Sequence, residues 1–173
     1  KHFLIGMIGA YKKNKGYDVI IKNYSKIKKI IPNLKIQTYG YESNYKLKEK
    51  IKMNKFKNFQ INNFEKKILN KLINFDLLLH PSFREGLSVS IMQSLQYGVP
   101  VIARNIPGNI DLIKNNFNGY LFDNEREMIH YIKKIYLSKK LRNKLSNNAA
   151  QTIDTSYLKK TVNEKILKFI KQI

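Results

Sequence analysis

The feature that most constrains the fold is the alternation of short apolar runs with segments of helical periodicity. Residues 3–8 and 34–39 read as strands, and between them Ile20, Tyr24 and Ile27 recur at helical spacing. This alternation favours βαβ units, in which parallel strands form a sheet and the connecting helices cover its faces. The chain is therefore expected to be an α/β protein with a parallel sheet of about six strands.

The other elements follow from the same patterns. A helix is expected from about Ser88 to Tyr97, because Gly98 and Pro100 form a helix-stop signal. The Lys-, Asn- and Tyr-rich residues 41–57 predict a helix followed by a loop. Apolar runs predict further strands at about 59–61, 76–80, 99–103 and 119–122, and apolar stripes predict helices around 68–72, 128–135 and 141–145 and a terminal helix over about 156–173.

Length and composition favour one domain over residues 1–173, with no internal repeat or linker. Without cysteine, neither disulfides nor thiolate metal sites are available. The longest apolar run, Leu77–Leu79, is far shorter than the roughly 20 residues that a membrane span needs. Because the chain begins with Lys and shows no signal peptide, we expect a protein region to precede it, and a cytoplasmic location.

The net charge of +21 raises the possibility of a polyanionic partner. Only four of the 33 basic residues are Arg, whereas nucleic-acid recognition favours the planar guanidinium. The lysines are spread along the whole chain, as expected if exposed positions have drifted towards Lys. We therefore expect no nucleic-acid partner, and peripheral contact with an anionic membrane stays an open alternative.

The most informative stretch begins at the end of the strand expected at 76–80. Pro81-Ser82 is followed after two residues by Glu85-Gly86, where a glycine is expected to open the helix. Ligands of open parallel sheets bind beyond the carboxyl ends of the strands. A helix N-terminus there offers free N–H groups to a phosphate or diphosphate, and Gly86 would let the backbone approach it closely.

The spacing within this stretch suggests an elongated ligand. Gln93 follows Glu85 by eight residues, which corresponds to about 12 Å along a helix. A nucleotide sugar has a suitable length, with the sugar at one end, the ribose at the other and the diphosphate between them.

The same stretch resembles the signature of glycosyltransferase family 4, in the GT-B fold: Pro-Ser, two residues, Glu-Gly, and a second Glu eight residues after the first. The resemblance continues through 98–103, 107–109, Asp111 and Gly119, and upstream through Gly9, Lys15-Gly16 and Asp18. Residues 103–109 also resemble the group named glycosyltransferase 1 domain-containing proteins.

This resemblance implies a Rossmann-like domain, the C-terminal, donor-binding half of a GT-B enzyme, whose N-terminal acceptor domain is absent from this chain. Glu85 would be the catalytic residue that binds the sugar hydroxyls, and Lys15 would neutralise the diphosphate. Such enzymes commonly retain the anomeric configuration without a metal, and no cofactor is expected besides the nucleotide diphosphate sugar itself, which is the substrate. The implied donor site consists of Lys15, Glu85, Gly86, Leu87, Ser88, Val89 and Gln93.

Two residues depart from the family pattern. Gln93 replaces the second Glu, and Ala10 stands where an Arg is expected beside Gly9. An amide can still bond a ribose hydroxyl, and Lys12 or Lys13 would be candidates to replace the lost charge. The departures leave open a catalytically degenerate module that only binds nucleotide sugars.

Some residues also have simpler interpretations. Glu85 alone could be a helix-dipole contact, and His80 at a strand end is as well explained by a structural or solvent-facing role. With three His and no Cys, a metal site has little support. Gly6 and Gly9 do not form a Gly-x-Gly-x-x-Gly fingerprint, which argues against nicotinamide or flavin cofactors.

Overall fold

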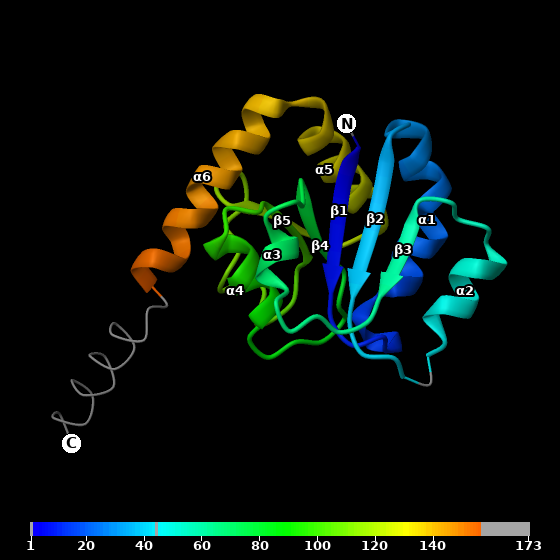
Figure 1. Ribbon diagram of the computed structural model, residues 1–173. Coiled ribbons are helices and arrows are strands. Elements are labelled where there is room, and N and C mark those ends of the chain that lie inside the picture. Colours follow the sequence, from blue (N-terminus) through cyan, green and yellow to red (C-terminus); the bar gives the residue numbers. More distant parts are fainter. Residues whose placement is uncertain (1, 44, 157–173) are drawn as a thin grey trace, which may run out of the picture.

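The computed structural model describes residues 2–43 and 45–156. The strands in these ranges form one parallel sheet in the order β3-β2-β1-β4-β5-β6 (Figure 1). The predicted α/β class and the six strands are thereby confirmed. The strands are β1 (Phe3–Ile8), β2 (Leu34–Tyr39), β3 (Phe59–Asn62), β4 (Leu77–His80), β5 (Val101–Arg104) and β6 (Gly119–Phe122).

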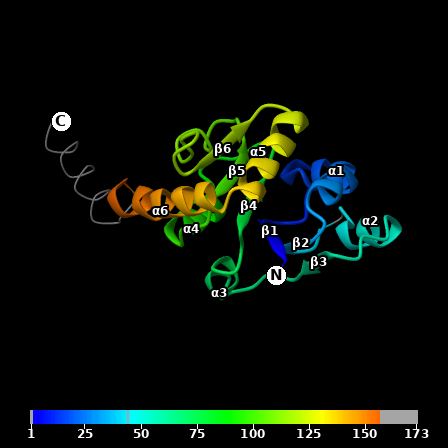
Figure 2. The same ribbon diagram turned by 90° about the horizontal axis from the view of Figure 1, so that it is seen from above.

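Helices cover both faces of the sheet. Figure 2 shows α1, α2 and α5 on one face and α3, α4 and α6 on the other. The helix expected over Ser88–Tyr97 is one residue shorter at each end, and most of the terminal helix expected over about 156–173 lies outside the described residues. The helices are η1 (Lys13–Lys15), α1 (Tyr17–Ile30), α2 (Leu47–Met53), α3 (Leu69–Leu72), α4 (Val89–Gln96), α5 (Glu125–Leu137) and α6 (Lys139–Ser156).

The apolar stripes predicted from the sequence form two cores, one on each face. On the first face Ile20 of α1 and Ile132 of α5 pack in one buried cluster with Ile5 of β1. On the second face Ile91 of α4 shares a cluster with Leu78 of β4. Burial of these apolar side chains is the main driving force for packing the helices onto the sheet.

The strand order reverses between β1 and β4. β1 pairs with β2 on one side and with β4 on the other, so the chain leaves these two neighbouring strands in opposite directions. The loops after β1 and β4 therefore diverge at the carboxyl edge of the sheet, which is the lower edge in Figure 1. A crevice at such a reversal point is the usual ligand site of doubly wound sheets.

Candidate active site

Two glycines hold the loop that follows β4. Gly16 has a φ of 75°, and a Cβ atom there would lie 2.2 Å from the Pro81 carbonyl oxygen. Gly108 has a φ of 86°, and its Cβ would lie 1.5 Å from the Gly86 carbonyl oxygen. Both the left-handed backbone and the close approach require glycine. Segments distant in the sequence thus enclose residues 81–86 from two sides.

Hydrogen bonds join this loop to the loop after β1. The Phe83 N–H donates to the Asn14 carbonyl oxygen at 2.8 Å, and the buried Ser82 hydroxyl donates to the same oxygen at 3.2 Å. Since Asn14 belongs to η1, these bonds fix Lys15, the next residue, beside the β4 loop.

Glu85 and Lys15 meet at this junction. The Lys15 Nζ atom donates to Glu85 Oε1 at 2.6 Å, and the two side chains are only 24% and 11% exposed. His80, the last residue of β4, brings its Nε2 atom to the same carboxylate oxygen at 2.9 Å. A carboxylate, an ammonium group and an imidazole therefore converge although they are separated by up to 70 positions in the sequence.

The surroundings of Glu85 keep its carboxyl ionised. Burial by itself raises the pKa of this carboxyl, but the hydrogen bonds from His80 and Lys15 outweigh it and lower the pKa from 4.5 to about 2. At neutral pH the group is therefore an acceptor of hydrogen bonds and not a proton donor.

His80 also links Glu85 to the start of α4. The Ser88 hydroxyl lies 3.4 Å from His80 Nε2, and the Ser90 hydroxyl lies 3.5 Å from His80 Nδ1 and 3.1 Å from Ser88 Oγ. Ser88 is the N-cap of α4 and accepts a hydrogen bond from the Ile91 N–H at 3.4 Å. A continuous polar chain thus runs from the carboxylate to the helix N-terminus.

These residues line a pocket of about 440 Å³, a volume within the range of small-molecule sites. Six of the seven predicted donor-site residues lie in its wall, and Gly86 does not. Nine further residues, from the sheet edge, the loops and α4, complete the charged and apolar lining. The wall includes Lys15, Glu85, Leu87, Ser88, Val89 and Gln93 from the predicted set, with His80, Phe64, Glu65 and Lys66.

Two predicted details are wrong. Gly86 does not open the helix, because α4 begins at Val89 after the Ser88 cap. The estimate of about 12 Å from Glu85 to Gln93 assumed a continuous helix, whereas Glu85 lies outside it. Lys12 and Lys13, the candidates to replace the family's Arg, line a different hollow with Ser43 and Tyr45 and not this pocket.

The wall contains nine residues outside the predicted set, among them His80 and Lys66. From the sequence, a structural or solvent-facing role explains His80 equally well, but in the structure its side chain is 6% exposed and lies 2.9 Å from Glu85 Oε1. Its position at the end of a strand, five residues before Glu85, was the available signal. Lys66 reaches the pocket from the loop after β3, and nothing in its Lys-rich sequence context distinguishes it.

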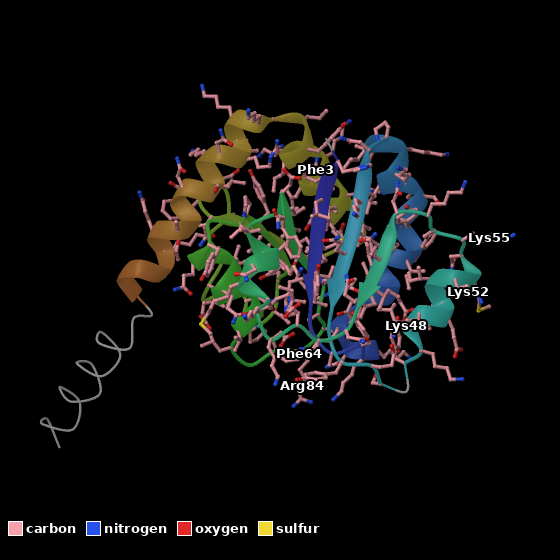
Figure 3. All side chains as sticks on the ribbon, viewed as in Figure 1. Phe3, Lys48, Lys52, Lys55, Phe64 and Arg84 are labelled. Atoms are coloured by element: carbon pink, nitrogen blue, oxygen red, sulfur yellow. The ribbon has the colours of Figure 1, made fainter. Side chains whose placement is uncertain are left out.

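The arginines of this region have different surroundings. Arg104 Nε donates to the Pro81 carbonyl oxygen at 3.3 Å, and its guanidinium lies 4.1 Å from the centre of the Phe83 ring, so it supports the β4 loop. Arg84 is exposed. Figure 3 shows it at the same edge of the molecule as Phe64, the edge where the strands end.

Within residues 2–43 and 45–156, no three His, Asp or Glu side chains are grouped so that they could hold a metal ion. Over the same residues, no helix combines the length and the apolar character needed to cross a membrane.

Residues 1–152 match the family described as "Glycosyl transferases group 1". Among curated relatives, glycosyltransferase 1 domain-containing protein 1 of Xenopus tropicalis is 31% identical over 80 residues, which are 46% of this chain and 23% of that protein. The chain thus spans less than a quarter of that relative's length.

Two solved structures have the same fold. Anabaena HepE in complex with UDP superimposes with a TM-score of 0.89 at 18% identity, over 99% of this chain and 49% of that chain. The C-terminal domain of a glycosyl transferase group 1 family protein, LpcC from Francisella tularensis, superimposes with a TM-score of 0.79 at 21% identity, over 90% of this chain and 86% of that domain. The Rossmann-like class predicted from the resemblance is confirmed.

The assignment to family 4 within this larger group stays a prediction. The order of motifs from Gly9 to Gly119, the pocket at the reversal of the sheet and the match over residues 1–152 agree with one another. The chain belongs to the glycosyl transferases group 1 family.

Proposed function

We propose that this chain is the donor-binding domain of a glycosyltransferase that takes a sugar from a nucleotide diphosphate sugar. The observation that carries the proposal is the convergence of Lys15 and Glu85 in one pocket at the N-terminus of α4. A cation beside free helix N–H groups suits a diphosphate, and a buried carboxylate suits sugar hydroxyls. The UDP bound by HepE, which has the same fold, supports this interpretation.

Each wall residue then has a role along the ligand. Lys15 and the N–H groups of Ser88 and Val89 hold the diphosphate, and Gln93 bonds the ribose. Glu85, which is ionised at neutral pH because its pKa is about 2, accepts hydrogen bonds from the sugar hydroxyls. When the diphosphate attracts Lys15, the ammonium group exchanges the carboxylate for a phosphate oxygen.

The proposed transfer retains the anomeric configuration and uses no metal. Charge that develops on the leaving diphosphate is stabilised by Lys15 and by the dipole of α4, both of which are in place before the reaction. Glu85 cannot serve as a general acid, because a carboxyl with a pKa of about 2 holds no proton at neutral pH.

The acceptor site belongs, in this proposal, to an N-terminal domain outside these 173 residues. Transfer requires an acceptor hydroxyl held next to the anomeric carbon, and that positioning supplies much of the rate. The chain matches 86% of an isolated C-terminal domain but only 49% of HepE, which supports a missing half. We propose a cytoplasmic location, and peripheral contact of the lysines with an anionic membrane is an alternative.

A second candidate is a module that binds nucleotide sugars without transferring them. Gln93 and Ala10 favour it, since each removes a charge expected from the family pattern, and neither Lys12 nor Lys13 lines the pocket. Turnover separates the two candidates. This chain alone is expected to show no transfer above hydrolysis, and turnover after addition of its N-terminal region, in cis or as a separate chain, would exclude the degenerate module.

Calorimetry tests the binding itself. We expect UDP-, GDP- or ADP-sugars to bind, with unchanged affinity in the presence of EDTA, and NMR shift changes to centre on residues 85–89. Loss of binding with EDTA, or shift changes elsewhere, would contradict the proposed site. An affinity whose logarithm falls steeply with the logarithm of salt concentration would instead identify a polyanion-binding protein.

A further inference from the structure

His80 stands where the sugar end and the phosphate end of the pocket meet. It is the last residue of β4 and is 4% exposed. Its Nε2 atom reaches Glu85 Oε1 at 2.9 Å, and its Nδ1 atom faces the Ser90 hydroxyl at 3.5 Å. Both ring nitrogens therefore face polar groups of the pocket, one on the β4 loop and one on α4.

We propose that His80 is a positioning residue that holds the Glu85 carboxylate in its sugar-binding orientation and ties it, through Ser88 and Ser90, to the N-terminus of α4. This inference rests on the proposed donor site. It adds a residue to that site for which the family resemblance gave no role.

The contrast between the two partners of Glu85 supports this role. Lys15 carries its ammonium group on a flexible four-carbon stem, and the diphosphate competes for that group. His80 has two side-chain torsions, lies on a central strand and is packed against α4 through its serine contacts. When Lys15 turns to the diphosphate, His80 keeps its contact with Oε1 of Glu85.

A role of His80 in packing the core alone would not explain its polar contacts. An imidazole buried at 4% exposure costs free energy unless its nitrogens are hydrogen-bonded, and an aliphatic residue would fill the same space without that cost. The His80 nitrogens instead lie within hydrogen-bonding distance of the Glu85 carboxylate and of the hydroxyls of Ser88 and Ser90.

Three variants of the chain test the role. His80→Leu removes both polar contacts, and His80→Gln keeps one N–H donor towards Glu85. His130→Leu makes the same change at an exposed histidine on α5, away from the pocket wall. Affinities are measured by calorimetry for UDP-glucose, UDP-N-acetylglucosamine, GDP-mannose and ADP-glucose and for the matching bare nucleotides, and the pKa of Glu85 is followed by NMR.

We expect His80→Leu to weaken the best-binding nucleotide sugar about tenfold more than its bare nucleotide, the loss typical of a hydrogen bond to a charged group. His80→Gln should recover most of this difference, and His130→Leu should cause none. Equal weakening of sugar nucleotide and nucleotide, or a glutamine variant no better than leucine, would overturn the inference and assign His80 to the core.

The NMR titration separates this inference from the proposed function. If the unmodified chain binds none of these ligands, the proposed donor site fails, and the pKa of Glu85 decides the role of His80. A rise from about 2 towards 4.5 in His80→Leu, with a smaller rise in His80→Gln, supports the positioning contact. A pKa unchanged in both variants refutes it.

Discussion

Two Lys–Glu pairs of this chain have the same chemistry and different surroundings. Lys15 Nζ lies 2.6 Å from Glu85 Oε1, with side chains 24% and 11% exposed, whereas Lys48 Nζ lies 3.6 Å from Glu42 Oε2, with side chains 55% and 43% exposed. Figure 3 shows Lys48 with Lys52 and Lys55 at the side of the molecule formed by α2, away from Arg84. In so lysine-rich a chain, burial and a second partner distinguish a site residue, and residue type does not.

The backbone differs between the two regions in the same sense. Next to the first pair, Gly16 adopts a left-handed φ of 75° without strain and packs on Pro81. Next to the second pair, Lys46 adopts a left-handed φ of 52° with a side chain that disfavours it. Tight backbone contact therefore supports the pocket, whereas the left-handed residue next to the exposed pair is a lysine.

The largest expected effect is that of Gly16→Ala. Its Cβ would lie 2.2 Å from the Pro81 carbonyl oxygen at a φ that disfavours alanine, so the β4 loop must shift. We expect unfolding in urea to show a loss of roughly 2 to 4 kcal/mol. Lys46→Gly, the opposite change in the other region, should gain up to about 1 kcal/mol. Equal and small effects at both positions would show that the loop is not held tightly.

Glu85→Ala comes next. If Glu85 binds sugar hydroxyls, this variant should weaken a nucleotide sugar by roughly 1.5 to 3 kcal/mol more than the bare nucleotide. Glu42→Ala, which removes the carboxylate of the exposed pair, should leave both affinities unchanged. Calorimetry with both ligands measures the difference. If both ligands lose affinity equally in Glu85→Ala, Glu85 interacts with the N-terminus of the helix and not with the sugar.

A smaller effect is expected for the contribution of ionised Glu85 to the free energy of unfolding, which depends on pH. The folded-state pKa of Glu85, about 2, lies below its ordinary value of 4.5, so its stabilising contribution is complete above pH 4.5 and is lost as the pH falls towards 2. The full shift corresponds to at most roughly 3 kcal/mol, and solvent screening at the open pocket reduces it to about 1 to 2 kcal/mol.

Other carboxyls, such as those of Asp18 and Glu125, also have a lowered pKa and contribute to the same acid transition. The comparison of the unmodified chain with Glu85→Gln isolates Glu85, because the shared contributions cancel. The free energies of unfolding of the unmodified chain and of Glu85→Gln should converge as the pH falls from 5 to 2. A constant difference between the two free energies over this range would mean that Glu85 does not titrate with the low pKa.

The smallest effect is expected at the exposed pair. Lys48→Ala should change the free energy of unfolding by less than about 0.5 kcal/mol, as is usual for a solvated ion pair, and should leave nucleotide affinity unchanged. The matching change at the buried pair is Lys15→Ala. It should weaken binding of the bare nucleotide and of the nucleotide sugar equally, because the lysine contacts the diphosphate that both ligands share. A larger loss of nucleotide affinity in Lys48→Ala would indicate that the phosphate binds near α2.

The sequence by itself determined the elements and their order. The strands at Phe3–Ile8, Leu34–Tyr39 and Gly119–Phe122 have the predicted bounds, and the stripe through Met128, Ile132 and Ile135 is the buried face of α5. These features depend on apolar periodicity, which is local in the sequence. The motif around Glu85 could also be identified from the sequence, because its residues are contiguous and its spacing is specific.

Only the tertiary structure decided which residues meet at Glu85. The resemblance singled out Lys15 but not its contacts, and the structure places Lys15 against Glu85 while Lys12 and Lys13 line another hollow. The role of His80 likewise depends on α4 packing beside the end of β4. Such contacts join segments up to 70 residues apart, and their geometry follows from the order of strands and the packing of loops, which no local pattern records.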